Sequence, residues 1–342
     1  RAGITVLIAR LYAEGKIQAV FGFGGLQNTS LCASAMQVLP IGVPKVLLST
    51  VASGERTFAS FVGSKDITMI PSIADLAGVN LLTEVALKNA SGAIMGMARY
   101  AGEALEPSGL VIGASMMGAT NDGIARAVKL LENAGKQVVT FHSTGVGGAA
   151  LEELIENSTI SAVLDLSLHE IVSQDVIGGG FSFGAKNRLS AAVKRQLPMV
   201  LAPGGLDFID FSVKEFNQGV LGDPKKRKFT LHNESIAHIK LTPQEAAKAA
   251  EVVVGRLQDY QGEAVMILPL RGLRSETHPG EKLYAPEVDQ KIFEVFRARL
   301  NRCIRLIELD AHLFDEAFSQ LAANEMLRLI GEKQHNFTQT NL

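Results

Sequence analysis

The chain has no tryptophan, only four tyrosines and only two cysteines among its 342 residues. Cys32 and Cys303 lie far apart in helix-like or strand-like surroundings, which argues against a disulfide framework and favours a reducing compartment. No apolar run approaches the roughly 20 residues that span a bilayer, and the sequence shows no signal-peptide pattern. We therefore expect a cytoplasmic protein with no membrane partner.

Neither sign of charge is in excess. The 33 basic and 35 acidic side chains leave a formal net charge of −2, which gives no electrostatic reason to expect nucleic acid as a partner. The one basic run, residues 225–228, is typical of a solvated loop. With 47% hydrophobic residues in 342, the chain can bury a large core, and its length favours two domains over one.

Apolar β-type runs alternate with amphipathic α-type runs, the pattern of layered α/β proteins with parallel strands. It predicts two doubly wound, mainly parallel-sheet, Rossmann-like domains with a cleft between them. The expected boundaries are 1–105 for the first domain, 106–333 for the second and 334–342 for a flexible tail. A small-residue helix over 81–102 suits a homo-oligomer, and residues 203–233 interrupt the alternation. Strands are predicted at 19–22, 45–49, 66–70, 110–115, 137–141, 162–166, 199–202, 264–268 and 304–309.

Three glycine-rich turns each follow a β-type run and precede an α-type run. They read GFGGLQNTS from Gly22, STGVGGAA from Ser143 and IGGGFSFG from Ile177. Glycine lets a backbone approach a ligand closely, and the helix that follows offers unpaired N–H groups and partial positive charge to an anion. None matches a complete phosphate-loop or dinucleotide motif, and tight α/β connections also use glycine for geometry alone. The turns predict an anionic ligand, with phosphate the first choice, at Gly24, Gly25, Thr29, Thr144, Gly145, Gly147, Gly148 and Gly179.

Polar side chains gather at the expected carboxyl ends of the strands, where open parallel sheets bind ligands. Each one taken singly is also a common cap or turn former. As a set they indicate a binding cleft. The set comprises Thr50, Ser53, His142, Thr144, Asp165, Asp207, Asp210, Arg271, Asp310 and His312.

An acid–base reading of these residues gives an alternative function. Asp310 and His312 lie two apart, so in an extended segment they face the same side, and a carboxylate that orients an imidazole is a recurring acid–base device. With Asp165 they would form the catalytic group of a small-molecule hydrolase or lyase, and Arg271 would hold a substrate carboxylate. A metal set that adds Asp165 or Glu170 lacks HExxH or paired-cysteine spacing, so we assign no metal.

Several ordered segments, spread from about residue 1 to 330, resemble one protein family. They are LPIGVPKVLLSTVASG (39–54), KDITMIPSIADLAGVN (65–80), FHSTGVGG (141–148), APGGLDFIDF (202–211), HNESIAHIKLTPQE (232–245), LPLRGLRS (268–275) and ELDAHLFD (308–315). These segments are similar to the ATP-binding domain of the plant tobamovirus-resistance protein and its uncharacterised bacterial relatives. The resemblance implies two α/β subdomains, ATP as cofactor, possibly with magnesium, and an upstream strand-and-helix segment that residues 1–105 lack.

The glycine turns follow the family pattern unequally. The family's GGSGGT becomes GGLQNTS over 24–30, where the family's small residues are replaced at 26–28. A D-R pair after the third turn becomes Asn187 and Arg188, so only Arg188 carries over. The second turn, over 144–148, keeps the pattern and is the preferred anion site. The resemblance implies a protein that binds ATP or a related phosphorylated small molecule, and its antiviral plant members suggest a second alternative, an interaction module that nucleotide stabilises.

Overall fold

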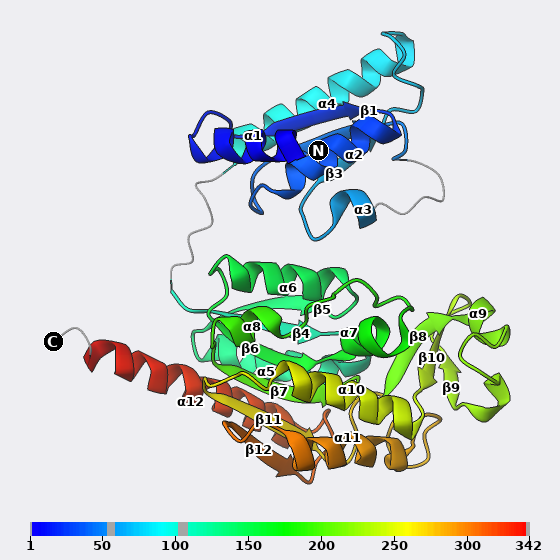
Figure 1. The fold of residues 1–342 in the computed structure, drawn as a ribbon, viewed down its shortest axis with the longest axis vertical. Helices are drawn as coiled ribbons and strands as arrows, with labels where there is room; N and C mark the ends of the chain where they lie inside the picture. Colours follow the sequence, from blue (N-terminus) through cyan, green and yellow to red (C-terminus); the bar gives the residue numbers. More distant parts are fainter. Residues whose placement is uncertain (1, 53–58, 102–108, 340–342) are drawn as a thin grey trace. The chain divides into compact units, whose positions relative to one another are not determined.

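The chain forms two compact units, Arg1–Glu106 and Pro107–Leu342, each described by itself. The structure is a computed structural model that describes residues 2–52, 59–101 and 109–339. Ser53, one of the expected ligand residues, lies outside these ranges. Figure 1 shows helices and strands in alternation through both units, so the predicted α/β class is confirmed.

Unit 1 is a small parallel sheet with helices on both faces. Strands β1 (Val20–Gly24), β2 (Lys45–Ser49) and β3 (Thr68–Pro71) lie in the order β1-β2-β3. The helices are α1 (Ala2–Ala13), α2 (Leu26–Gln37), α3 (Ala59–Val62) and α4 (Leu81–Tyr100).

The central strand of unit 1 is buried on both faces. Because side chains alternate along a strand, Leu47 packs with α2 while Val46 and Leu48 pack with Ala86 and Ala90 of α4. Two of the small residues of α4, Ala86 and Ala90, therefore serve close packing of this helix on its own sheet.

Unit 2 is built on a six-stranded parallel sheet with strand order β12-β11-β7-β6-β4-β5. After β5 the chain returns past β4 to form β6, which places a topological switch point between β4 and β6, the position where such sheets bind ligands. The strands are β4 (Val111–Met116), β5 (Gln137–His142), β6 (Ala162–Ser167), β7 (Met199–Gly204), β11 (Ala264–Pro269) and β12 (Ile304–Leu309).

Helices cover both faces of this sheet. One apolar cluster joins the sheet to α5 (Asn121–Asn133) and α12 (Glu316–Gln339). A larger cluster covers the opposite face. Its helices are α6 (Val146–Glu156), α8 (Ser190–Lys194), α10 (Pro243–Arg256) and α11 (Pro286–Arg299). Helix α12 continues to Gln339, through part of the segment expected as a flexible tail.

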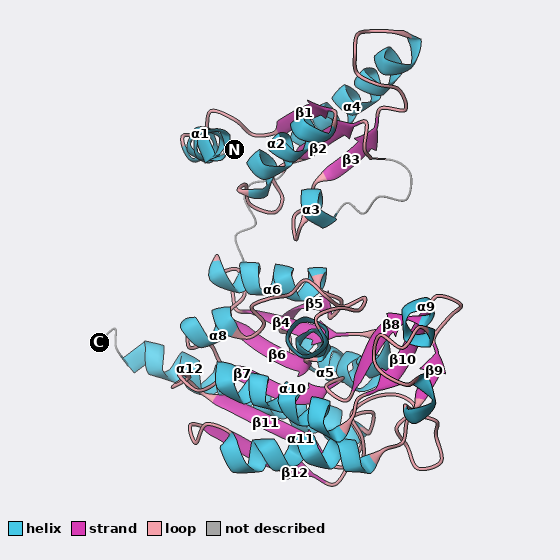
Figure 2. Cartoon of the chain, turned by 45° about the vertical axis from the view of Figure 1, so that its right-hand side comes forward, coloured by secondary structure: helices cyan, strands magenta, loops and turns pink. Residues whose placement is uncertain are grey.

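A small antiparallel sheet follows β7, where the sequence suggested irregular structure. It consists of β8 (Phe208–Ser212), β10 (Ile236–Lys240) and β9 (Phe229–Leu231), in the order β8-β10-β9 (Figure 2). The strands are short, and polar residues such as Asp210 and Lys240 lie among their buried positions, so no clear alternation marks them. Short helices complete unit 2: η1 (Gly118–Thr120), α7 (His169–Ile171), the π-helix η2 (Val172–Ile177), α9 (Val213–Asn217) and η3 (Pro224–Lys226).

All nine predicted strands are present, with ends within two residues of the predicted ends. Within the part of the chain that the structure describes, no helix has the length and apolarity to cross a membrane.

Candidate functional site

The second glycine turn, between β5 and α6, already holds an anion that the chain itself supplies. Glu170 Oε1 accepts hydrogen bonds from the amides of Gly145, at 2.6 Å, and Gly148, at 3.0 Å. Thr144 lies in the same turn, where its amide donates to the carbonyl of His142. The turn thus holds an anionic group, as its sequence predicts, but this group is the carboxylate of Glu170. An external phosphate would have to displace it.

Close packing explains why this turn needs glycine. A Cβ at Gly147 would lie 2.0 Å from the carbonyl oxygen of His142, and one at Gly148 would lie 2.0 Å from Glu170 Oε2. Gly145 has φ +88°, a conformation that L side chains rarely adopt. These three glycines are therefore required by the fold whether or not a ligand binds.

Glu170 belongs to a buried ionic network centred on Arg188. The guanidinium donates to Glu170 from Nε at 2.6 Å, to both Asp165 oxygens from Nη2 at 2.8 Å, and to Glu152 from Nη1 at 3.2 Å. Burial alone would lower the pKa of Arg188, but Asp165, Glu170 and Glu152 together raise it above its usual value. Asp165 also accepts from Ser115 of β4 at 2.5 Å, so the network ties together the strands at the switch point.

The third glycine turn closes the π-helix η2. Gly178 has φ +75°, and the amide of Gly179 donates to the carbonyl of Ser173 at 2.9 Å. A Cβ at Gly180 would lie 2.7 Å from the carbonyl oxygen of Asp210. The next helix, α8, begins only at Ser190 and has five residues, so this turn does not lead directly into a helix N-terminus.

The first glycine turn, in unit 1, leads into a helix whose N-terminus is open. Gly25 is the N-cap of the 12-residue helix α2 and supplies no side-chain cap. The amides of Leu26, Gln27 and Asn28 have no acceptor among residues 2–52, 59–101 and 109–339. This turn offers free donors at the place where Glu170 fills the turn in unit 2.

The two glycines of this turn have different reasons to be glycine. Gly24 has φ +146°, and a Cβ there would lie 2.5 Å from Cβ of Asn28. Gly25 has φ −77° and ψ −171°, which any residue can adopt, and a Cβ there would meet only Thr50 Oγ1, at 3.7 Å. Nothing inside the described protein therefore requires glycine at position 25.

Hydroxyl groups hold the base of this turn. Thr29 Oγ1 lies 2.6 Å from Ser49 Oγ and donates to the carbonyl of Gly24 at 3.2 Å. The amide of Thr50 donates to the same Gly24 carbonyl at 3.2 Å. The structure thus brings together four residues predicted for a ligand site: Gly24, Gly25, Thr29 and Thr50.

The predicted pairing of Asp310 with His312 does not form. Both Asp310 oxygens accept from Arg271, each at 2.7 Å, and these two side chains are 74% and 63% exposed. The expectation assumed an extended segment, but the chain turns at this point, since the amide of Ala311 donates to the carbonyl of Leu309. The three proposed catalytic residues are consequently not assembled, because Asp165 lies in the Arg188 network.

Both ring nitrogens of His312 are used inside the protein. Nδ1 accepts from the amide of Phe314 at 3.0 Å, and Nε2 lies 3.2 Å from Thr277 Oγ1. The Thr277 hydroxyl donates its proton to the carbonyl of Arg274, so Nε2 of His312 is the donor in the contact with Thr277. Burial lowers the pKa of His312 to about 4. At neutral pH this imidazole is therefore an uncharged structural group.

A second buried ionic group contains residues that the sequence analysis missed. Lys240 Nζ donates to Asp207 at 2.6 Å and to Asp289, in the first turn of α11, at 2.9 Å. Burial raises the pKa of Asp289 to about 7, and the charge of nearby Asp207 adds to this rise, despite the opposing effect of Lys240. Of these residues only Asp207 was predicted, since a lysine in a strand and an acid near a helix start are common surface features.

Arg274, also missed, lies fully buried against an aromatic ring. Its guanidinium carbon is 3.8 Å from the centre of the Phe208 ring, which also stacks on His169 at 4.2 Å. His169 contacts the carbonyl of Gly205 through Nδ1 and the carboxylate of Asp210 through Nε2, both at 2.9 Å. Since both partners are oxygen acceptors, a proton on each ring nitrogen satisfies both contacts. Among the residues described, no three His, Cys, Asp or Glu side chains are placed to hold a metal ion.

Comparison with known proteins establishes the family. The UPF0261 N-terminal domain matches residues 1–103 and the UPF0261 C-terminal domain matches residues 110–330; both are described as parts of an uncharacterised protein family. This chain belongs to the UPF0261 family, so the family resemblance expected from the sequence motifs is confirmed at that level.

Relatives come from bacteria and from tomato. A UPF0261 protein of Clostridium tetani is 34% identical over 329 residues, which cover 96% of this chain and 80% of the relative. The ToMV resistance protein Tm-1(GCR237) of Solanum lycopersicum is 30% identical over 334 residues, covering 94% of this chain and 43% of the tomato protein. The ToMV susceptible protein tm-1(GCR26) is 30% identical, with 98% and 45% covered. The chain thus spans less than half the length of the tomato relatives.

Proposed function

We propose that this chain binds ATP or a closely related phosphorylated small molecule, with a phosphate group at the N-terminus of α2 in unit 1. The observation that carries the proposal is the set of three unpaired amides at residues 26–28, which follow the carboxyl end of a parallel strand. Such amides, together with the partial positive charge of the helix end, are suited to a phosphate.

The two halves of the chain differ in a way that supports this location. In unit 2, Glu170 satisfies the amides of Gly145 and Gly148. In unit 1, the corresponding helix start has no side chain of this kind among the described residues. An anion from outside the chain would complete α2 as Glu170 completes α6.

Gly25 is consistent with the same role. Its backbone conformation is open to any residue, and a methyl group there would make only an ordinary contact with Thr50. Asp, Asn, Ser or Thr at the N-cap would stabilise the helix more than glycine does. Glycine keeps the approach to the amides free for a ligand.

The resemblance to the plant resistance family is the reason for choosing ATP among phosphorylated molecules. The acid–base alternative has no comparable support, because Asp165, Asp310 and His312 lie in three separate sets of contacts. The interaction-module alternative remains compatible with nucleotide binding.

Thermal unfolding with ATP, ADP, AMP and adenosine, each with and without magnesium, tests the proposal. A ligand that binds only the native state raises the midpoint by mass action. We expect ATP and ADP to raise it and adenosine, which has no phosphate, to have little effect. Equal midpoints with all four compounds at millimolar concentration would remove nucleotide from the account.

A further inference from the structure

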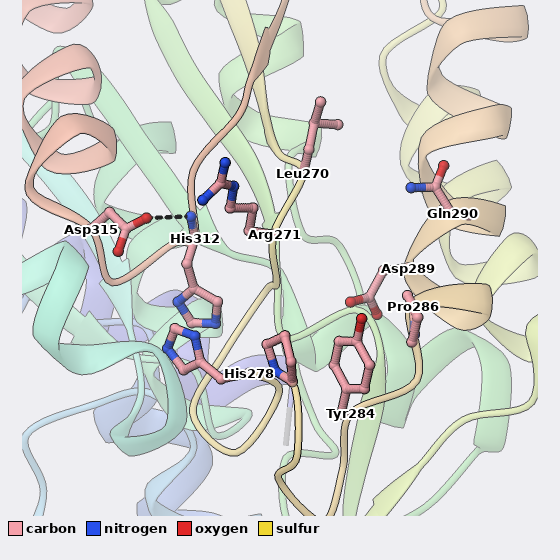
Figure 3. A pocket seen from close by; sticks show the side chains of 10 residues that line it. Leu270, Arg271, His278, Tyr284, Pro286, Asp289, Gln290, His312 and Asp315 are labelled. Atoms are coloured by element: carbon pink, nitrogen blue, oxygen red, sulfur yellow. Dashed lines mark hydrogen bonds between the residues drawn. The ribbon is translucent and has the colours of Figure 1, made fainter.

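A cavity in unit 2 has a lining that does not resemble a nucleotide site. It has a volume of about 490 Å³, within the roughly 300–1,000 Å³ typical of small-molecule sites. Figure 3 shows it between the loop that follows β11, the start of α11 and the turn that follows β12. Its lining residues are Leu270, Arg271, His278, Pro279, Tyr284, Pro286, Asp289, Gln290, His312 and Asp315.

One part of the lining contains Arg271 and the stacked rings of His278 and His312. Arg271 uses Nε and Nη2 to bind Asp310, and its Nη1 has no acceptor in the described parts of the chain. His278 stacks on His312 with ring centres 3.9 Å apart, and its ring nitrogens make no hydrogen bond to any described residue. A guanidinium with a free donor and an imidazole whose ring nitrogens have no partner among the described residues are each suited to a carboxylate.

Another part of the lining offers a carboxyl, an amide and a phenol group for hydrogen bonding. Asp289 binds Lys240 through Oδ1, which leaves Oδ2 without a partner among the described residues while the side chain stays only 9% exposed. Gln290 presents an amide, and Tyr284 has a hydroxyl with no acceptor in the described ranges. Carboxyl, amide and phenol groups of this kind bind the hydroxyl groups of a ligand.

The hydrophobic faces of the cavity complete the pattern. Pro279, Pro286 and the ring of Tyr284 supply apolar surface between the polar groups. Carbon chains that carry a hydroxyl on each carbon present C–H faces of matching character, and a carboxylate at one end would be the partner for Arg271.

We propose that this cavity binds a polyhydroxy carboxylate, an aldonic acid of about six carbons, with its carboxylate at Arg271 and His278 and its hydroxyl groups at Asp289, Gln290 and Tyr284. The site lies wholly in unit 2 and needs no phosphate. It is therefore a second site, separate from the nucleotide site proposed in unit 1.

Calorimetric titration with gluconate, galactonate and mannonate tests the ligand class. Glucitol, which lacks the carboxylate, and hexanoate, which lacks the hydroxyl groups, are the matched controls. We expect at least one aldonate to bind and both controls to bind at least about tenfold more weakly, since each forfeits charge-assisted or neutral hydrogen bonds. The proposal is overturned if none of the three aldonates binds at 10 mM, or if a control binds equally well.

Two further measurements test the location. Arg271→Gln should weaken aldonate binding at least about tenfold, whereas Arg297→Gln should not, because Arg297 forms a similar paired contact with Glu308 away from the cavity. A bound aldonate should also protect His278 from diethylpyrocarbonate, located by peptide mass spectrometry, and leave exposed His142 reactive. Aldonate binding that survives Arg271→Gln, or that leaves His278 unprotected, would contradict the assignment.

The two proposals fail separately. Arg271→Gln should leave ATP binding unchanged, and a substitution at Gly25 should leave aldonate binding unchanged. If ATP does not bind, the aldonate titration still decides the cavity.

Discussion

Replacing Gly25 with aspartate should separate stability from ligand binding in unit 1. Gly25 is the N-cap of α2 and leaves three amides open. An aspartate there can accept from the amides of Gln27 or Asn28, and its charge complements the helix end. A side chain fits, since a Cβ meets only Thr50 Oγ1 at 3.7 Å.

The expected magnitudes have opposite signs. Aspartate in place of glycine at an N-cap gains a few tenths of a kcal/mol, and the helix-end charge adds about 0.3–1 kcal/mol. The free energy of unfolding should therefore stay equal or rise by up to about 1 kcal/mol. In the Gly25→Asp protein, the aspartate occupies two of the amide donors that a phosphate would use, and each donor is worth about 1.5–3 kcal/mol for a charged acceptor. The affinity for ATP should fall at least about 100-fold.

Calorimetric titration with ATP and urea unfolding of the ligand-free protein measure the two effects. Gly25→Asn is the matched control, because it caps the helix without a negative charge and should weaken ATP binding less than Gly25→Asp. The reasoning would be refuted by a Gly25→Asp protein that binds ATP as tightly as the unchanged chain.

Four other predictions concern residues of unit 2. Arg188→Met should lower the free energy of unfolding by at least about 3–5 kcal/mol in urea titrations, because it leaves three buried carboxylates without their cation; a loss below 1 kcal/mol would show that the network is not structural. Gly147→Ala should destabilise the fold by at least about 1–3 kcal/mol, because its methyl group meets a backbone carbonyl, and an unchanged melting temperature would contradict this packing. Thr242→Ala removes the capping box of α10 and should cost about 1 kcal/mol in urea titrations, and an unchanged free energy of unfolding would contradict this role. Burial lowers the pKa of His312 to about 4 from 6.5, so the stability that the neutral ring contributes is present above pH 6.5 and is lost as the pH falls toward 4. The urea midpoint of His312→Gln should therefore fall less between pH 7 and pH 5 than that of the unchanged protein. Equal falls of the two midpoints would contradict this role of His312.

Regular apolar patterning made most of the fold predictable. The strand Lys45–Ser49 and the strand Ile304–Leu309 were predicted with the bounds that the structure has, because each is a compact β-type run between turn signals. The small antiparallel sheet was missed, since Lys240 and Asp210 occupy buried positions that a hydrophobic pattern cannot indicate. These polar residues can be buried because each has an oppositely charged or hydrogen-bonding partner that is remote in the sequence. Lys240 binds Asp207 and Asp289, and Asp210 binds His169.

The candidate sites were predictable only as sets of residue types. Glycine turns indicated where an anion can bind, but nothing in the local sequence says that Glu170, more than 20 residues away, fills the turn at Gly145 and Gly148. The spacing of Asp310 and His312 suggested a pair, and a turn at Ala311 prevents it. The contact of Glu170 with the glycine turn depends on how segments remote in the chain pack together, and the separation of Asp310 from His312 depends on a local turn. Neither can be read from residue types and spacing in a single sequence.

The central claim, a phosphate at the start of α2, is tested most directly by titrating isotope-labelled protein with ATP and following backbone amide resonances. The account predicts that the amides of Leu26, Gln27 and Asn28 shift with ATP, while those of Gly145 and Gly148 stay in place because Glu170 holds them. Shifts confined to Gly145 and Gly148, or no shift at residues 26–28 at saturating ATP, would contradict it.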